Sequence, residues 1–527
     1  MSTPDNHSGL TLTKREVKRL ERQQRKSEQQ PVENPLKGLW ANMKAQREES
    51  LTRPGPTGWR REGGGPTGFI EAPFEIQGST VQICGYYPFS VGAGMPVIGA
   101  PLGYHLLNRS LVCADPISWF LHRIVSNPSA FILGQPGLGK TSLVHRWISV
   151  LADWGVVPMV LADSRPDYVH TIRELEGQVI TFSPGQGHIN PLDLGPLVRQ
   201  MSTLEDATEQ DQAVAEMSQR RKSLITGLVA MFLERGLKPH ERTLLAQSLN
   251  ALDPDLTDPP LLDDLIGFVQ QRPELLRKAT LTYADDAEYD IRVRDVLDAL
   301  IALGPDGMYG DMFSKPTSEH ITPGKPVVFD ISGINENDHL LMGAVQSLCW
   351  NLGSAAVSAE QYLAADQGRP RKTYFLVMDE LWRILRASED MVLFIDSITR
   401  LNRGRGMAQV MITHTMNDLK LQHEHLTETA WGFVERSALV FLGGLAEGEM
   451  GNLKEVFNLS GAEVSKLSDW TGEAAVDQWT GKAGMRPGAG NFLLKTGKES
   501  GIPLHVQLVD AEKETTDTNR NWQMVDS

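Results

Sequence analysis

The sequence has few of the features that mark secreted, disulfide-bonded or membrane-spanning proteins. Its three cysteines, Cys84, Cys113 and Cys349, are far apart, odd in number and not spaced as metal ligands. We interpret them as thiols in a reducing compartment. No run of about 18 apolar residues occurs, which predicts no transmembrane helix. The start of the chain is polar and lacks an apolar core, so it does not have the pattern of a signal peptide.

Several kinds of catalytic and metal site are also missing from the pattern. No Ser/His/Asp arrangement or cysteine nucleophile context is evident. His423 and His425 lie on a polar predicted helix, and we interpret them as surface residues rather than metal ligands. We interpret Trp350, Trp382 and Trp431 as packing residues rather than as rings that stack on a nucleotide.

The charge is acidic overall and unevenly distributed. The net charge is −15, yet residues 1–66 hold 13 Lys/Arg against 8 Asp/Glu, so the remaining chain carries −20. A protein that binds DNA tightly without sequence preference needs a basic footprint. The acidic body therefore argues against such binding, although a ring-shaped assembly can place a basic pore inside an acidic shell.

The composition suggests four regions along the chain. Residues 1–66 comprise a charged tail and a Gly/Pro linker, which we expect to be flexible. The tail is either a solvated helix or a docking arm for an acidic partner or membrane surface. Short apolar stretches in residues 67–125 predict a small β-rich module. Residues 126–510 form the main domain, and residues 511–527 are a polar tail.

The main domain alternates strand and helix patterns, which predicts an α/β fold with a mostly parallel central sheet. Helical periodicity dominates residues 200–322, so we expect an α-helical insertion there. Short apolar runs are typical of strands covered on both faces. They occur at 129–133, 157–161, 178–182, 326–331, 374–378, 408–413 and 437–442, with a terminal hairpin at 490–495 and 502–508.

The most specific motif is GQPGLGKT at residues 134–141, which fits the phosphate-loop pattern GxxxxGK[ST]. An apolar strand precedes it and an amphipathic helix follows. In such a loop the backbone wraps the phosphates, the lysine reaches the β- and γ-phosphates, and the threonine hydroxyl binds Mg²⁺. The predicted ATP-binding residues are Gly134, Gln135, Pro136, Gly137, Leu138, Gly139, Lys140, Thr141 and Ser142.

Two further strands end in polar residues that suit phosphate chemistry. The strand at 374–378 ends in Asp379 and Glu380, which we predict as the Mg²⁺ ligand and the base for the attacking water. An Asp-Glu pair that only caps a helix is the alternative. His414 follows the strand at 408–413 and is expected to lie beside the Asp379 strand, where it can sense the γ-phosphate. A histidine that is merely hydrogen-bonded at a strand end is its alternative.

Arginines in the segment TRLNRGRG, residues 399–406, are candidates for a residue that acts in trans. In ring ATPases an arginine from a neighbouring subunit stabilises the charge of the transition state. Arg400, Arg403 and Arg405 are the candidates here, and at least one of them is expected to be an ordinary surface residue.

Taken as a set, these motifs resemble the VirB-type cytoplasmic ATPases of conjugation and type IV secretion, in the HerA–FtsK branch of P-loop motors. The resemblance rests on GQPGLGKTS, LADSRPDY, LEGQVITFSPGQGHINPLDL, MDELWRIL and RLNRGRGMAQVMITHT, and covers about residues 125–510. The Ile-Asn-Pro-Leu-Asp stretch at 189–193 and the Asp-Glu-x-Trp at 379–382 are its most specific parts.

The resemblance implies a RecA-like core with a helical lid, hexamers at least transiently, and ATP and Mg²⁺ as cofactors. It also implies work with membrane-embedded channel proteins at the cytoplasmic face of the cell membrane. Arg403 falls where the branch places its trans-acting arginine, and Arg436 is similar to a second motif arginine. Two positions depart from the pattern: His414 stands where glutamine is usual, and residues 1–125 are too few for the family's large N-terminal domain.

Three functions stay open at this point. The first is an ATPase that energises assembly of a secretion apparatus or transfer through it. The second is a DNA translocase or coupling-type pump of the same superfamily. The third is a nucleotide-dependent scaffold without turnover, which the histidine at position 414 keeps open.

Overall fold

The computed structural model divides the chain into two units, Met1–Ile83 and Cys84–Ser527. It describes residues 14, 15, 18, 19 and 22, then 96–474 and 486–516 except 284, 388–390, 394, 397–398, 400–403, 405, 422 and 498. The few described residues of the first unit are helical. Most of the predicted tail and linker, and residues 67–95 of the predicted β-rich module, lie outside the described residues. All that follows concerns the second unit.

An eleven-stranded sheet runs through the second unit in the order β2-β1-β11-β10-β9-β3-β8-β7-β4-β6-β5. The strands from β9 to β5 in this order are parallel to one another, and β10, β11, β1 and β2 extend the sheet with antiparallel pairs. The strands are β1 (Pro101–His105), β2 (Leu111–Cys113), β3 (Ser129–Leu133), β4 (Val157–Asp163), β5 (Gln178–Thr181), β6 (Val327–Asp330), β7 (Tyr374–Met378), β8 (Met407–Thr413), β9 (Leu439–Leu442), β10 (Asn491–Lys495) and β11 (Ile502–Val506).

The sequence predicted β3 and β7 with these same bounds, and the other strands of the main domain to within a few residues. These strands are almost continuously buried, because helices cover both faces of the sheet. The described part of the predicted β-rich module does not form a sheet of its own. Instead, β1 pairs with β11 and thereby satisfies the backbone groups at that edge of the main sheet.

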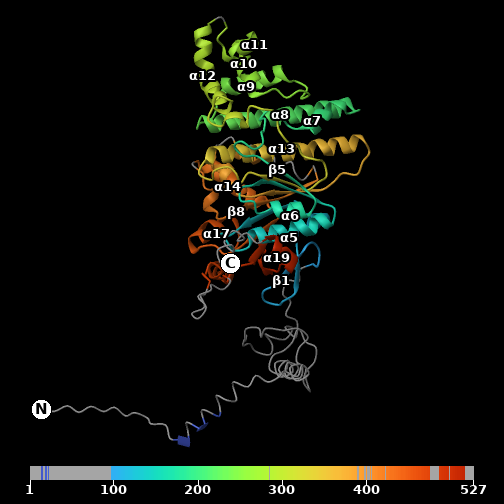
Figure 1. The fold of residues 1–527 in the computed structure, drawn as a ribbon, viewed down its shortest axis with the longest axis vertical. Helices are drawn as coiled ribbons and strands as arrows, with labels where there is room; N and C mark the ends of the chain where they lie inside the picture. The colour runs from blue at the N-terminus through green and yellow to red at the C-terminus, as the bar shows by residue number, and fades with distance from the viewer. Residues whose placement is uncertain are drawn as a thin grey trace, which may run out of the picture. The chain divides into compact units, whose positions relative to one another are not determined.

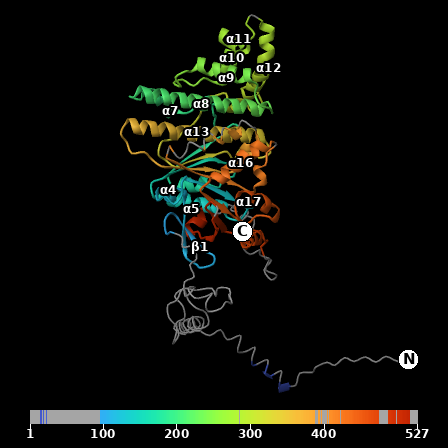
Figure 2. The ribbon, with the colours of Figure 1, turned by 180° about the vertical axis from the view of Figure 1, so that it is seen from behind.

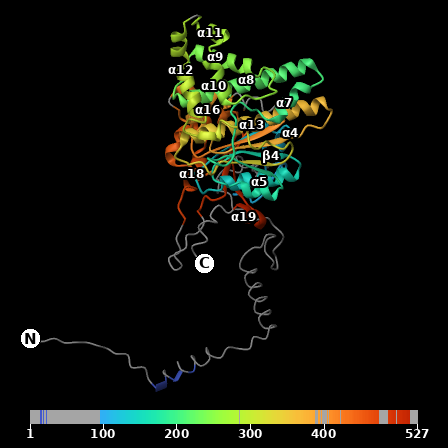
Figure 3. The ribbon, with the colours of Figure 1, turned by 45° about the horizontal axis from the view of Figure 1, so that its top comes forward.

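Helices on one face of the sheet bury their apolar sides against alternate strand residues. Trp147 of α5, for example, packs edge-on against Phe375 and Phe441. Figure 2 shows α4 beside α5, and Figure 3 shows α5 and α13 on opposite sides of β4. The helices of this layer are α4 (Pro116–Leu121), α5 (Lys140–Asp153), α6 (Val169–Glu174) and α19 (Asp510–Thr516).

The long helix α13 (His339–Asp366) covers the other face, and the insertion stacks on it (Figure 1). Its mean hydropathy reaches 1.3, high enough for a membrane span by composition, but 94% of that window is buried inside the protein. A helix that is apolar all round is expected where both of its sides are covered. Here the sheet covers one side and α8 the other.

The α-helical insertion is confirmed, and its helices lie between β5 and β6 in sequence. Arg220 of α8 donates a 2.6 Å hydrogen bond to Ser354 of α13, which ties the insertion to the helix that covers the sheet. The insertion contains α7 (Pro196–Gln200), α8 (Ala207–Phe232), α9 (Pro239–Leu252), α10 (Leu262–Gln270), α11 (Glu274–Thr280) and α12 (Asp286–Leu303). The remaining helices of that face are α14 (Leu381–Ala387), α16 (Glu424–Arg436), α17 (Met450–Val456) and α18 (Gly461–Asp469).

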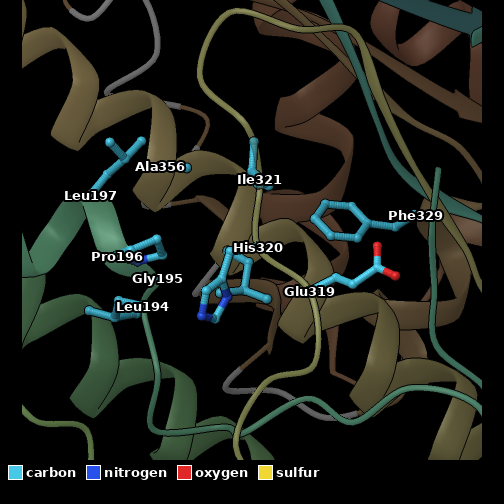
Figure 4. Close-up of a pocket in the computed structure, with 10 residues that line it drawn as sticks. Leu194, Gly195, Pro196, Leu197, Glu319, His320, Ile321, Phe329 and Ala356 are labelled. Carbon is cyan, nitrogen blue, oxygen red and sulfur yellow. The ribbon is translucent and has the colours of Figure 1, made fainter. Parts of the chain in front are cut away.

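The Ile-Asn-Pro-Leu-Asp stretch lies where the chain enters this insertion and contacts the segment by which the chain leaves it. Figure 4 shows Leu194–Leu197 on the way in, close to Glu319–Ile321 on the way out. Asn190 donates a hydrogen bond to the Pro260 carbonyl, and Asp193 lies 3.2 Å from Arg199 and 3.7 Å from His320. The stretch therefore joins both connections of the insertion to each other.

Candidate nucleotide-binding site

The phosphate-loop residues form a tight turn from β3 to α5. Gly137 and Gly139 have φ angles of 78° and 93°, which L-residues with a side chain rarely adopt. A Cβ on Gly139 would also lie 3.2 Å from the Gly490 nitrogen. Helix α5 begins at Lys140, so the N–H groups of its first turn have no intrahelical partners and point out of the helix. The turn therefore has the backbone geometry that an anion-binding cradle requires.

Lys140 is nearly buried and contacts three groups around the loop. Its Nζ donates to the Gly134 carbonyl at 2.6 Å and the Gln135 carbonyl at 3.3 Å, and lies 2.9 Å from Nδ1 of His414. Burial lowers the pKa of Lys140, while the carboxylates of Asp379 and Glu380 oppose that shift. Within the described residues Lys140 has no ion pair, so its charge is available to a bound anion.

Asp379 and Glu380 follow β7 two strands away from the phosphate loop, since β8 separates β7 from β3. Asp379 accepts hydrogen bonds from the Tyr168 hydroxyl at 3.0 Å and the Glu380 N–H at 2.8 Å. Burial and the adjacent Glu380 raise the pKa of Asp379. A divalent cation would favour its ionised form, and carboxylate and hydroxyl oxygens are the ligands that Mg²⁺ prefers. The chemistry of the Asp379 carboxylate thus suits the metal ligand that the sequence predicts.

Glu380 lies in a strained turn. Its φ angle is 52°, a left-handed conformation that costs a residue with a side chain about 1–2 kcal/mol. The turn is held by the Glu380 N–H on Asp379 and by Gln346 of α13, which donates to the Asp379 carbonyl at 2.8 Å. The strain directs the Glu380 side chain toward β8, where His414 lies.

His414 connects Lys140 to Glu380. An ammonium group can only donate, so Nδ1 of His414 accepts from Lys140 and the ring proton lies on Nε2. That nitrogen is 3.4 Å from Oε1 of Glu380. The adjacency of β7 and β8 that the sequence predicted is confirmed. The direct contact with both charged residues was not predicted.

The environment keeps Glu380 ionised. Burial works against the charge, but the contacts with His414 and the indole N–H of Trp382 outweigh it and lower the pKa of Glu380. From the sequence, Trp382 is expected only to pack against its neighbours. Its position two residues after Glu380, at the start of a helix, is the signal that it could reach back to the carboxylate.

The candidate arginines are not brought into this site by the described chain. Arg400, Arg403 and Arg405 lie outside the described residues. Arg436 ends α16 and precedes β9, which places it at the amino edge of the sheet, opposite the phosphate loop. Its guanidinium forms a 2.6 Å ion pair with Asp396.

Comparison with known proteins identifies the fold. No protein-family model matches the chain, and no curated protein matches it. The structure is similar to VirB4 of Thermoanaerobacter pseudethanolicus, with a TM-score of 0.56 and 16% identity over 79% of this chain and 98% of that one. This likeness confirms the predicted fold class, a RecA-like P-loop core with a helical insertion.

Two other structures match with lower scores. The plasmid coupling protein TrwB, in complex with ADP and Mg²⁺, matches with a TM-score of 0.43 and 12% identity over 72% of this chain and 86% of that one. The cytoplasmic domain of the Thermomonospora curvata type VII secretion ATPase EccC matches with a TM-score of 0.29 and 13% identity, over 81% of this chain and 31% of that one.

Proposed function

We propose that this chain is an ATP-hydrolysing motor of the VirB type, which energises assembly of a conjugative or type IV secretion-like apparatus or transfer through it. The observation that supports it most is the contact chain from Lys140 through His414 to Glu380, beside Asp379, at the carboxyl edge of the sheet. A phosphate cradle, a metal ligand and an ionised carboxylate are the parts that phosphoryl transfer to water requires. The VirB4-like fold supports the class of motor.

Each residue of the site has its own role in the proposed hydrolysis of ATP. The cradle and Lys140 hold the β- and γ-phosphates, and Thr141 and Asp379 would hold Mg²⁺, which would supply positive charge against them. Glu380 orients a water whose oxygen bonds to the γ-phosphorus, and it accepts that water's proton as the bond to the β,γ-bridging oxygen breaks. ADP and phosphate are the products.

His414 is proposed to couple ATP binding to the base. When Lys140 turns to the phosphates, Nδ1 of His414 loses its donor, while Nε2 still faces Glu380. The His414 contact lowers the pKa of Glu380, and the Nε2–H of His414 would be a weaker donor once Nδ1 no longer accepts from Lys140, so Glu380 would become a better base. The histidine would thereby report whether Lys140 is engaged.

Assembly into a hexamer is part of the proposal. Arg403 of a neighbouring subunit would complete the site, with Arg400 and Arg405 as weaker candidates. Arg436 is weaker still, because it is already paired with Asp396. The proposed place of work is the cytoplasmic face of the cell membrane, against the channel proteins of the apparatus.

The test is steady-state ATP hydrolysis by the purified full chain, with and without single-stranded and double-stranded DNA. Glu380→Gln is expected to lower turnover at least about 1000-fold while ATP still binds. Asp255→Asn, an exposed carboxylate in the insertion, is the matched control and should match the wild type.

Each outcome points to one function. Turnover that depends on Glu380 and ignores DNA supports the secretion motor. Strong stimulation by DNA would favour a DNA pump instead. Wild-type turnover no faster than that of Glu380→Gln would leave a nucleotide-gated scaffold.

A further inference from the structure

Cationic and acidic side chains stand together at the carboxyl edge of the parallel strands, among the aspartates Asp163, Asp167, Asp330 and Asp379. In the strand order β3-β8-β7-β4-β6, Lys140 follows β3, Glu380 follows β7, Arg165 follows β4 and Glu336 follows β6. The proposed reaction uses Lys140 and Glu380. Arg165 and Glu336 follow β4 and β6, the strands farther from the phosphate loop, and have no role in that reaction.

Arg165 follows β4, the neighbour of the strand that Asp379 and Glu380 follow. Val160 of β4 pairs with Val377 of β7, and the register of β4 shifts before Asp163, so the strand order places Arg165 on the loop beside the one that carries Glu380. Asp163 fixes this loop, because its carboxylate accepts the N–H groups of Asp167 at 3.1 Å and Tyr168 at 2.8 Å. The backbone of Arg165 is therefore anchored, while its side chain is 58% exposed.

Arg165 forms a solvent-exposed ion pair with Glu336. Its Nε and Nη2 donate to the two carboxylate oxygens of Glu336 at 3.1 and 3.5 Å. Both side chains are about half exposed, at 58% and 47%. Ion pairs of this kind contribute little to stability, so the fold does not depend on the contact.

The charge of Arg165 also acts within the site. The hydrogen bond with Glu336 raises the pKa of Arg165, and the carboxylates of Glu380 and Asp167 raise it further. In the same way, the charge of Arg165 is one of the causes that lower the pKa of Lys140. The guanidinium thus lies in the same electrostatic field as the phosphate-binding lysine.

We propose that Arg165 is a second phosphate ligand in cis, which exchanges Glu336 for the γ-phosphate when ATP binds. A terminal phosphate carries more negative charge than one carboxylate, and its oxygens suit the planar guanidinium fork. ADP lacks the γ-phosphate and would leave Arg165 on Glu336. The residue would therefore make the site prefer ATP to ADP. This inference rests on the proposed function, because it assumes that the phosphate loop binds ATP.

The test compares the affinity for the β,γ-imido analogue of ATP with that for ADP, both with Mg²⁺, in the full chain. Arg165→Ala is expected to weaken binding of the ATP analogue about tenfold and binding of ADP less than twofold. The tenfold loss corresponds to about 1.4 kcal/mol, which we attribute to the contact with the γ-phosphate. Arg165→Lys should recover part of the loss. Glu336→Gln should strengthen the ATP analogue several-fold, because it removes the competing carboxylate.

The double variant decides whether the two residues act on one another. In Arg165→Ala/Glu336→Gln the gain from Glu336→Gln should vanish. A gain that persists without Arg165, or an equal loss of ATP-analogue and ADP affinity in Arg165→Ala, would overturn the proposal. If Arg165→Ala does not fold, Glu336→Gln must still raise the preference for the ATP analogue over ADP. Failure of the wild type to bind either nucleotide would contradict the proposed function itself.

Discussion

Buried cations have different partners in two regions of the molecule, the helical insertion and the carboxyl edge of the sheet, where we propose that the nucleotide binds. In the insertion, Arg221 and Asp253 are 2% and 4% exposed and form a 2.7 Å ion pair, and Arg221 also donates to the Asp253 carbonyl. At the carboxyl edge, Lys140 is 9% exposed, and its partners among the described residues are backbone carbonyls and a histidine. A buried cation with its own carboxylate serves the fold, whereas one without a carboxylate is left for a ligand. The comparison separates charge that stabilises this protein from charge that is kept for chemistry.

The largest expected effect comes from the carboxyl edge. Lys140→Met keeps the aliphatic stem but removes the charge, and it should lower ATP hydrolysis at least about 1000-fold. Because no carboxylate pairs with Lys140 in the described part of the chain, the free energy of unfolding should stay the same or rise slightly. Hydrolysis assays and chemical denaturation measure the two quantities. A loss of stability as large as the loss of activity would contradict the comparison.

The insertion should show the reverse. Arg221→Ala leaves Asp253 as a buried carboxylate without its partner and should cost about 3–5 kcal/mol of unfolding free energy. The protein that remains folded should hydrolyse ATP at the wild-type rate. Arg272→Ala is the matched control, because its ion pair with Asp290 is exposed to solvent and its loss should change the unfolding free energy little. Similar losses in the two variants would show that burial does not decide the effect.

The smallest expected effect on the unfolding free energy comes from His145, a buried titratable group that stays neutral. Burial lowers the pKa of His145 to about 4, from 6.5, while its Nδ1 contacts the Thr171 hydroxyl at 2.8 Å. The unfolded chain therefore binds more protons between these pH values. The stability due to neutral His145 is complete above pH 6.5 and is lost as the pH falls toward 4, by at most about 3 kcal/mol.

His145→Gln should remove this dependence, so the measurement is the difference in unfolding free energy between wild type and variant at several pH values. The difference is the right quantity because burial raises the pKa of Asp163 to about 7, which makes its contribution change with pH in the opposite sense. A difference that does not change between pH 7 and pH 4 would show that His145 is protonated as easily in the folded protein as in the unfolded chain.

Much of the fold and the inner part of the site could be predicted from the sequence. The strands of a doubly covered parallel sheet are short apolar runs, so β3 and β7 were found with their bounds. The phosphate loop is a local motif whose glycines are needed for its own turn. Asp379 and Glu380 stand directly after a buried strand, so their place at the sheet edge follows from that strand alone.

Other features are decided by contacts between distant parts of the chain. The strand order brings β4 between β7 and β6, which places Arg165 between Glu380 and Glu336. The same order joins β1 and β2 to the C-terminal strands rather than to a module of their own. The strand order depends on the packing of both faces of the sheet, so it cannot be predicted from the sequence of any one segment.

By itself, then, the sequence determined which residues could carry the chemistry and on which strand ends they stand. Only the tertiary structure decided which of them meet: His414 between Lys140 and Glu380, Trp382 on Glu380, and Arg165 on Glu336. The physical reason is that local apolar patterns fix strands and turns, whereas contacts between side chains on different strands depend on a sheet order that the whole core selects.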